Sequence, residues 1–340
     1  MDKRLILAVA GSGKTSLIIE NLNLEKRCLL VTYTQNNYHN LRQKVIKKFG
    51  YLPENIRILT YETFLYRFCV KPFLSYKLRP KGVTFDKQPP RFAKGVNRYM
   101  DSNKRLYASR ICQLLIKCGR MTDVIKRVDD FYDAFYIDEV QDFAGHDFDL
   151  LVHLKKSNVE IMFVGDFYQH TFSTSRDGSK NKSLHKNYDN FKQKFIKIGI
   201  EVDEECLSKS YRCSPTVCEF ITNNIGISIE SHNVEKTNIR LVDSSEEIEV
   251  IMKDDSIIKL FYQNCSKYDC YSKNWGVSKG EDCHTDVCVI LNRTTMAKYK
   301  KGQLDQLAPT TKNKFYVACS RAKRHLYFIE ESKVKHYKII

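Results

Sequence analysis

The chain has 340 residues, which is enough for two domains with separate cores but short for three. Lys and Arg outnumber Asp and Glu by 56 to 40, giving a formal net charge of +16. This charge favours a polyanionic partner without identifying it, with a solvated basic surface as the alternative, and no apolar run approaches the ~20 residues of a membrane span.

The cysteine usage bears on the compartment. Twelve cysteines without regular pairing suit a reducing cytosol better than a secreted disulfide scaffold. The first residues run directly into an apolar segment, so we expect no signal peptide. The sequence therefore predicts a cytoplasmic protein without membrane contact.

A glycine-rich turn, AGSGKT, follows the first apolar segment. Residues 5–9 predict a strand and residues 16–22 a helix. Such a turn binds phosphate through backbone N–H groups and the helix dipole, to which Lys14 adds a full charge. The hydroxyl of Thr15 is suited to the magnesium of a triphosphate, although Ala8 replaces the first glycine of the usual pattern. The alternative is a chance glycine-rich turn. The predicted nucleotide contacts are Ala10, Gly11, Ser12, Gly13, Lys14, Thr15 and Ser16.

Two further strands are predicted, at residues 28–32 and 56–59, with a basic amphipathic helix at 38–49 separating them. Strands that alternate with helices imply a parallel sheet, whose loops gather at one edge. The polar ends of both strands would then lie beside the phosphate turn, where ligands bind in such sheets.

A basic, aromatic-rich insertion occupies residues 65–130. Between positions 65 and 110, twelve Lys or Arg stand against only Asp86 and Asp101, and eight aromatic residues are interleaved. Cations for phosphates and rings for unstacked bases are typical of a track for single-stranded nucleic acid. A solvated insertion with a small local core is the alternative.

An acidic pair, Asp138 and Glu139, follows a strand that begins near Phe135. Alone, such a pair is often a solvated turn. Together with a phosphate turn, Asp138 can hold magnesium and Glu139 can deprotonate the attacking water. The next strand, residues 160–164, ends near Gln169, which is placed to contact a γ-phosphate.

A second domain begins at about residue 206, so we expect domains 1–205 and 206–340. Strands are predicted at 287–291 and 326–329, and residues 314–318 read as a strand or a helix start. From 201 to 255 the balance reverses to thirteen acidic against five basic residues, which indicates a solvated face or a surface for a protein partner.

The ordered motifs resemble those of superfamily 1 helicases of the UvrD/Rep type, in a compact form that lacks the large accessory domain. AVAGSGKT resembles motif I, LLVTYTQNN and RILTYETF resemble motifs Ia and Ib, and YIDEVQD resembles motif II. VGDFYQ, LSKSYRCS, GVSKGEDCHTDVCVIL and FYVACSRAKRHLYF resemble motifs III to VI. The resemblance implies two RecA-like parallel-sheet domains with a nucleotide cleft between them.

The same resemblance implies roles for individual residues, with ATP and Mg²⁺ as cofactors. It makes Lys14, Glu139, Gln169, Arg212 and Arg321 catalytic, the two arginines acting as arginine fingers. By sequence alone, Arg212 also reads as a surface ion pair and Arg321 as part of a basic cluster. The resemblance assigns magnesium to Thr15 and Asp138. It adds Tyr211, Gly280 and Glu281 to the nucleotide contacts, and gives nucleic-acid contacts to Thr32, Tyr33, Thr60, Tyr61, Phe64 and Lys279.

Together these expectations describe an ATP-dependent translocase or helicase that hydrolyses ATP with magnesium and binds single-stranded nucleic acid, DNA rather than RNA. The alternative is a nucleotide-gated switch or ATPase subunit that docks a protein such as a nuclease and unwinds little by itself.

Overall fold

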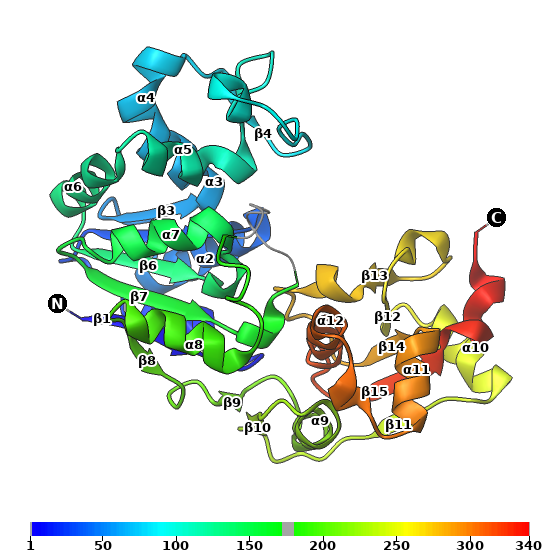
Figure 1. Ribbon diagram of the computed structural model, residues 1–340. Helices are drawn as coiled ribbons and strands as arrows, with labels where there is room; N and C mark the ends of the chain where they lie inside the picture. Colours follow the sequence, from blue (N-terminus) through cyan, green and yellow to red (C-terminus); the bar gives the residue numbers. More distant parts are fainter. Residues whose placement is uncertain (1, 172–179, 340) are drawn as a thin grey trace. The chain divides into compact units, whose positions relative to one another are not determined.

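The computed structural model describes residues 2–171 and 180–339, which form two compact units (Figure 1). Unit 1 comprises the chain up to Asp203, except for two short segments, residues 8–13 and 168–171. Unit 2 comprises these two segments and the chain from Glu204 onward. Each unit contains a parallel sheet covered by helices, which confirms the predicted α/β class. Within the described ranges, we find no helix with the length and apolar character that crossing a membrane requires.

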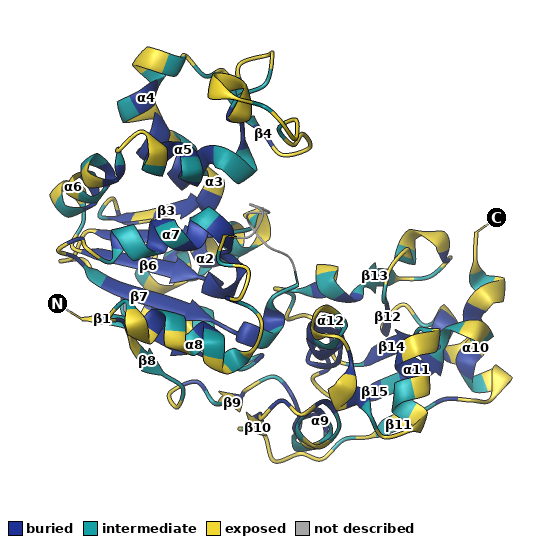
Figure 2. Ribbon diagram, in the orientation of Figure 1, coloured by how far each residue is buried: buried dark blue, intermediate teal, exposed yellow. Residues whose placement is uncertain are grey.

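Unit 1 is built on a six-stranded sheet with the order β3-β2-β6-β7-β1-β8, and every neighbouring pair is parallel. Its central strands are buried on both faces (Figure 2), which explains their continuous apolar sequences. The strands are β1 (Lys3–Leu7), β2 (Cys28–Thr32), β3 (Ile56–Thr60), β6 (Ala134–Asp138), β7 (Glu160–Gly165) and β8 (Glu201–Asp203).

Among the helices of unit 1, α2 starts and stops at ordinary capping signals. Thr34 caps the first N–H groups of α2 with its hydroxyl, and Gly50 ends that helix in a left-handed conformation. In Figure 1, α7 and α8 cover the near face of the sheet and α2 covers the far face. These helices are α1 (Lys14–Glu20), α2 (Gln35–Phe49), α7 (Gly145–Leu154) and α8 (Tyr188–Lys197).

The insertion of unit 1 lies beyond β3 (Figure 1) and combines both expected characters. Some of its aromatic side chains, such as those of Tyr99 and Tyr107, are buried in a local core. Tyr76 and Phe92, by contrast, are 86% and 82% exposed. Helix α3 (Tyr61–Thr63) leads into the insertion. The elements of the insertion are the π-helix η1 (Phe64–Val70), α4 (Lys71–Leu78), β4 (Gly82–Thr84), η2 (Gly95–Arg98), β5 (Arg105–Tyr107), η3 (Ala108–Arg110), α5 (Ile111–Lys117) and α6 (Met121–Phe131).

Unit 2 contains a five-stranded parallel sheet with the order β11-β15-β14-β12-β13 and a small pair, β9 and β10. The strands are β9 (Lys209–Ser210), β10 (Glu230–Ser231), β11 (Ile239–Leu241), β12 (Ile258–Phe261), β13 (Ser272–Asn274), β14 (Val287–Leu291) and β15 (Leu326–Glu330). The longer helical segments are α9 (Pro215–Phe220), η6 (Ile221–Ile225), α10 (Ser245–Lys253), η8 (Trp275–Ser278), α11 (Arg293–Lys300), α12 (Pro309–Cys319) and η10 (Glu331–Tyr337).

The period of two along β14 divides unit 2 into two cores. Val287 and Val289 pack into the cluster that contains residues of α9 and α12. Cys288 and Ile290 pack into the opposite cluster, beneath α10. Successive side chains of a strand point to opposite faces, so this alternation predicts burial on both sides of the sheet.

The structure revises two of the local predictions made from the sequence. The helix expected over residues 111–130 is two helices, because Gly119 adopts a left-handed conformation, with φ of 65°, after α5. Residues 314–318, which read as a strand or a helix start, lie within the helix α12. The helix is long enough to cover a sheet face, and its residues from Phe315 to Cys319 are buried.

Candidate nucleotide site

The strand order of unit 1 places three of the predicted nucleotide and magnesium contacts, Lys14, Thr15 and Asp138, at one edge of the sheet. Strand β7 lies between β1 and β6, and all three are parallel, so Leu7 and Asp138 end at the same edge of the sheet. Two strand spacings separate β1 from β6, roughly 10 Å. Lys14 and Thr15 begin α1 shortly after β1, which places them at the edge that carries Asp138.

The glycine turn needs its glycines. Gly11 and Gly13 have φ values of 73° and 92°, in the region that L-residues avoid. The strand predicted to reach Val9 ends at Leu7, so the turn starts earlier, and Ser12 Oγ donates a hydrogen bond of 2.9 Å to the Val9 carbonyl. Ser16 is exposed on α1.

Glu139 is held in an unusual conformation. Its φ of 62° and ψ of 43° lie in the left-handed region, which is uncommon for any residue other than glycine, asparagine or aspartate. Asp138 and Glu139 are 4% and 6% exposed. Buried carboxylates on a strained backbone at a strand end are typical of functional sites.

Gln141 connects the acidic pair to the end of the next strand, a link that sequence reasoning missed. Its Nε2 donates to Glu139 Oε2, and its Oε1 accepts a 3.1 Å hydrogen bond from the Asp166 N–H. Gly165 allows this approach, because a Cβ there would collide with Gln141 Oε1 and would also lie 2.9 Å from Val140 Cγ1. The glutamine was visible in the YIDEVQD block, but nothing in the sequence indicated its two partners.

His185 supports Gln141 from a distant part of the chain. Its Nε2 lies 2.8 Å from the Gln141 carbonyl oxygen, and its ring stacks on that of Phe167. Burial lowers the pKa of His185 to about 4, so the ring is neutral at pH 7 and Nε2 carries the proton that it donates.

This buried histidine makes unit 1 sensitive to acid. Because the pKa of His185 is lower in the folded state than in the unfolded state, its contribution is present above the unfolded pKa and is lost as the pH falls toward 4. We expect about 2 kcal/mol of stability to be lost through this group between pH 7 and pH 5. Thermal unfolding by circular dichroism at both pH values should show a smaller loss for His185→Gln than for the wild type; equal losses would contradict this assignment.

Residues 168–171, which belong to unit 2, carry Gln169. Its side chain is 3% exposed, at the end of the short helix η5 (Phe167–Gln169). The segment is held in unit 2 by the side-chain amide of Asn313, which donates a 3.0 Å hydrogen bond to the His170 carbonyl. The ring of Tyr168 also packs edge-on against that of Tyr316.

Arg321 is buried in unit 2, with only 2% exposed. Nε donates to the Val317 carbonyl at 3.1 Å and an Nη1 hydrogen to the Glu281 carbonyl at 2.7 Å. Burial, and then the charge of Arg212, lower its pKa to about 9, so the guanidinium remains charged at neutral pH. A buried cation held by carbonyl groups, which carry no full negative charge, favours the approach of an anion.

Arg212 lies in the same neighbourhood. Its Nη1 donates to the Ser320 carbonyl at 3.3 Å, next to Arg321, and its Nε forms an ion pair with Asp282 Oδ1 at 2.7 Å. Burial favours the neutral form of Asp282, but Arg212 and other nearby cations outweigh it and keep the pKa of Asp282 below its ordinary range. The fold therefore brings the two predicted arginines to one turn, with one carboxylate bonded to Arg212.

The glycine turn contacts this arginine cluster directly, and its residues 8–13 belong to the same unit 2. The Tyr211 N–H donates a 2.9 Å hydrogen bond to the Gly11 carbonyl, and the Ala10 N–H donates to Tyr316 Oη at 2.8 Å. A Cβ on Gly11 would fall 2.5 Å from Arg212 Cβ. Motifs I, IV and VI of the sequence therefore meet in space.

Tyr211 presents an aromatic surface next to the turn. Its ring is stacked on His232, with a centroid separation of 3.8 Å and an interplanar angle of 10°. The side chain is nevertheless 64% exposed. A flat ring of this kind, supported from one side, can stack on a nucleobase; His232 was not predicted, because nothing in the sequence marks it.

Gly280 and Glu281 form the turn that follows η8. Gly280 has a φ of 84°, and the backbone carbonyl of Glu281, not its carboxylate, contacts Arg321. The Glu281 carboxylate instead pairs with Lys273 and accepts a 2.8 Å hydrogen bond from His284 Nε2. Lys279 is half-buried in the same turn.

The predicted nucleic-acid residues of unit 1 divide into two groups. Thr32 and Thr60 are paired across β2 and β3, so these two strand ends lie side by side, and Tyr33 follows directly. The side chains of Tyr61 and Phe64 are buried in the core: Tyr61 Oη lies 3.1 Å from Cys112 Sγ, and Phe64 stacks on Phe68. We therefore assign no base-stacking role to Tyr61 or Phe64, because both rings pack in the interior of unit 1.

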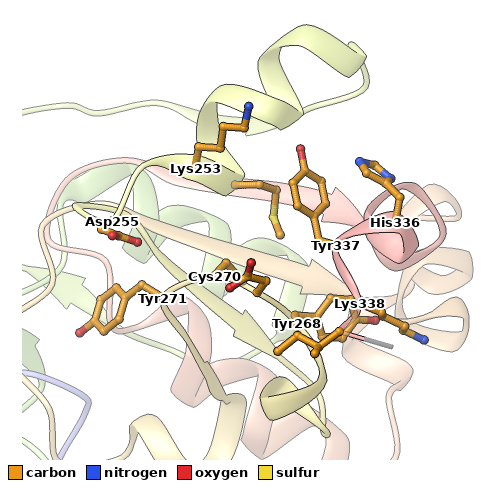
Figure 3. A pocket seen from close by; sticks show the side chains of 11 residues that line it. Lys253, Asp255, Tyr268, Cys270, Tyr271, His336, Tyr337 and Lys338 are labelled. Carbon is orange, nitrogen blue, oxygen red and sulfur yellow. The ribbon is translucent and has the colours of Figure 1, made fainter.

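Unit 2 also has an open pocket of about 880 Å³ that none of the predicted residues lines (Figure 3). Its charged groups are largely compensated. Lys253 pairs with Glu249 at 2.5 Å, and the Lys338 ammonium lies 5.5 Å from the ring centre of Tyr268. Asp255 lines the pocket as well, so it carries no excess of one charge that would select a ligand.

No family model matches the sequence, and a search of curated proteins finds no match. Among solved structures, the chain is similar to arterivirus nonstructural protein 10, a helicase, in complex with DNA. The TM-score is 0.51 with 13% identity, over 96% of this chain and 61% of the other. The chain thus spans about 61% of that protein.

Two further helicase structures are similar at lower TM-scores. The PRRSV helicase gives 0.48 with 13% identity, covering 98% of this chain and 53% of the other. A crystal structure of arterivirus nonstructural protein 10 gives 0.48 with 14% identity, covering 98% and 62%. At sequence identities this low, structural similarity is evidence of a shared fold and of nothing more. The argument for the fold rests on the first comparison alone. The chain therefore shares the fold of the matched part of that protein, with two RecA-like units.

Proposed function

We propose that this chain is an ATP-dependent translocase on single-stranded nucleic acid, of the UvrD/Rep type and with helicase activity. The observation that carries the proposal is the convergence in unit 2 of the glycine turn with Arg212 and Arg321, the two arginines that the sequence predicts as arginine fingers. A cytoplasmic location, indicated by the cysteine usage, belongs to the same proposal.

In the proposed reaction, the triphosphate binds at the glycine turn and Lys14 contacts its terminal phosphates. Glu139 accepts the proton of the attacking water, and Gln141 holds its carboxylate in place. Arg321 uses three of the five N–H groups of its guanidinium in the hydrogen bonds given by the described structure, which leaves donors for the negative charge that develops during phosphoryl transfer. Gln169 reports the presence of the γ-phosphate.

Thr15 and Asp138 fit magnesium, because a hydroxyl and a carboxylate are the oxygen ligands that this ion prefers. Two protein ligands are sufficient for this ion where the phosphates of the nucleotide complete the coordination. When bound, the ion would neutralise charge on the β- and γ-phosphate oxygens.

The proposed nucleic-acid track follows the carboxyl ends of β2 and β3 at Thr32, Tyr33 and Thr60 in unit 1. In unit 2, the motif resemblance assigns a nucleic-acid contact to Lys279. Basic residues and exposed rings of the insertion, such as Phe92, support the track. Closure of nucleotide-binding domains on ATP converts hydrolysis into a movement that can step along a strand.

The ATP hydrolysis rate, measured with single-stranded DNA, duplex DNA and RNA, tests this function. We expect single-stranded DNA to increase the rate at least about tenfold, and Lys14→Ala to abolish the activity, because the terminal phosphates lose their cation. A slow rate that no nucleic acid changes, together with ATP-dependent binding of a protein partner, would contradict the proposal and support a nucleotide-gated switch.

A further inference from the structure

An open groove of about 550 Å³ follows the outer side of β3, the edge strand of the unit 1 sheet. Its walls are formed by β3, by the π-helix η1 that follows soon after it, and by the distant α6 with the residue after that helix. None of the individually predicted nucleotide or nucleic-acid contacts lines it, although Arg67, Phe68 and Arg127 belong to the basic insertion at 65–130. The residues that matter for the argument are Arg57, Arg67, Phe68, Arg127, Phe131 and Tyr132.

The groove carries uncompensated positive charge. In the described part of the chain, Arg57, Arg67 and Arg127 form no ion pair with a carboxylate. Arg27, at one end of the groove, shows the contrast, since it is bonded to Asp133 at 2.7 Å. Among the described residues that line the groove, Glu54 alone carries a carboxylate. Three arginines that converge on one groove without acidic partners are typical of phosphate recognition.

Aromatic rings hold the central arginine in place. The Arg127 guanidinium lies 4.9 Å from the ring centre of Phe68 and 4.8 Å from that of Phe131. Its Nε is buried and makes no hydrogen bond in the described structure. The planar cation is therefore fixed by the rings and not by an acceptor, so that little conformational entropy is lost when it binds an anion.

The groove also offers surface for bases. Phe131 is 52% exposed although it contacts Arg127, and Tyr132 follows it at the end of α6. Rings that alternate with arginines provide both contacts that a single strand requires, stacking for the base and a cation for the phosphate. A duplex, with its bases stacked internally, could use only the arginines.

The position of the groove connects it to the proposed track. It extends from Asn55, just before β3, to Thr63, just after it, which corresponds to roughly 16 Å along a five-residue strand. Thr63 Oγ1 accepts a 2.8 Å hydrogen bond from Thr60 Oγ1, and Thr60 ends β3 at the edge where the track is proposed. The groove therefore begins where that track leaves the sheet.

We propose that this groove binds single-stranded nucleic acid as an extension of the track, with Arg57, Arg67 and Arg127 on phosphates and Phe131 and Tyr132 on bases. The inference rests on the proposed function for the identity of the strand, and it goes beyond that function in extending the binding site along the outside of the sheet.

The test is binding of fluorescent oligothymidylates of increasing length to the full chain, measured by anisotropy without nucleotide at several salt concentrations. The test variant is R57Q/R67Q/R127Q. The matched control is K194Q/K197Q, which removes charges from α8, the helix that packs on β8 at the opposite edge of the sheet. Circular dichroism and the basal ATP hydrolysis rate confirm that each variant is folded.

For the arginine variant, we expect affinity for the longer oligonucleotides to fall at least about tenfold, while the shortest ones that bind are affected little. The slope of log K against log salt should decrease by about 2, because three phosphates at ~0.7 each are no longer neutralised. Phe131→Ala should weaken binding of the long oligonucleotides about fivefold or more without changing that slope, since stacking carries no charge.

Wild-type affinity and slope in the arginine variant would overturn the inference, as would an equal loss at every length or a preference for duplex over single strand. The outcomes also distinguish this inference from the proposed function. If nucleic acid does not stimulate ATP hydrolysis but length-dependent binding still requires the three arginines, the groove inference holds and the proposed translocase function is wrong. If stimulation is normal and the arginine variant binds like the control, the groove inference alone is wrong.

Discussion

Replacing Arg321 with alanine is expected to lower kcat for ATP hydrolysis by about 10³-fold or more, while the affinity for ATP changes by less than about fivefold. The guanidinium is 2% exposed and is bonded to carbonyl groups, so its charge is poorly compensated until a phosphoryl group develops negative charge. An arginine that meets this charge stabilises the transition state more than the ground state, and that difference appears in kcat.

The buried position of Arg321 requires a control for folding, because the same side chain holds the Glu281 carbonyl. Arg321→Lys keeps the charge but loses the fork of N–H donors, so it should remain folded and still lose most of the activity. Lys323→Ala removes an exposed cation from the same turn and should leave kcat within about twofold. Near-normal hydrolysis by a folded Arg321→Ala protein would show that Arg321 is not an arginine finger.

Glu139→Gln is expected to reduce kcat by about 10²- to 10⁴-fold, with ATP binding retained. The substitution preserves the shape of the side chain and an oxygen that can accept from Gln141 Nε2, but it removes the carboxylate that takes the proton from water. Single-turnover hydrolysis measures the chemical step directly. Glu20→Gln, an exposed carboxylate at the end of α1, is the matched control and should behave as wild type. A folded Glu139→Gln protein whose single-turnover rate is close to that of the wild type would remove Glu139 from the mechanism.

The sequence predicted the fold well where one signal dominates. Strands β2, β6, β7 and β14 are continuous apolar runs that end in polar residues, and the buried sheets confirm them to within two residues. The prediction failed where one residue determines the local structure: Gly119 divides the helix expected at 111–130 into two. It stayed open at 314–318, because a segment this short and apolar fits a strand and a helix equally well.

The candidate site shows the same division. Arg212 and Arg321 were predicted from their motifs, and the fold brings both to Ser320. Gln141, His185 and His232 were not predicted, because each depends on a partner that only folding supplies. The groove beside β3 could not be predicted either, because only folding brings its residues together. Arg57 and Arg127 are separated by seventy positions, and no local pattern indicates that they share a surface.

The central claim is that the triphosphate held by the glycine turn is also the one on which Arg321 acts. Affinity for ADP with magnesium and aluminium fluoride, a mimic of the phosphoryl group in transfer, tests this claim without requiring residual activity. The wild type should bind the mimic at least about 100-fold more tightly than ADP alone, and a folded Arg321→Ala protein should bind both with nearly equal affinity. An Arg321→Ala protein that retains the full wild-type preference for the mimic would contradict the account.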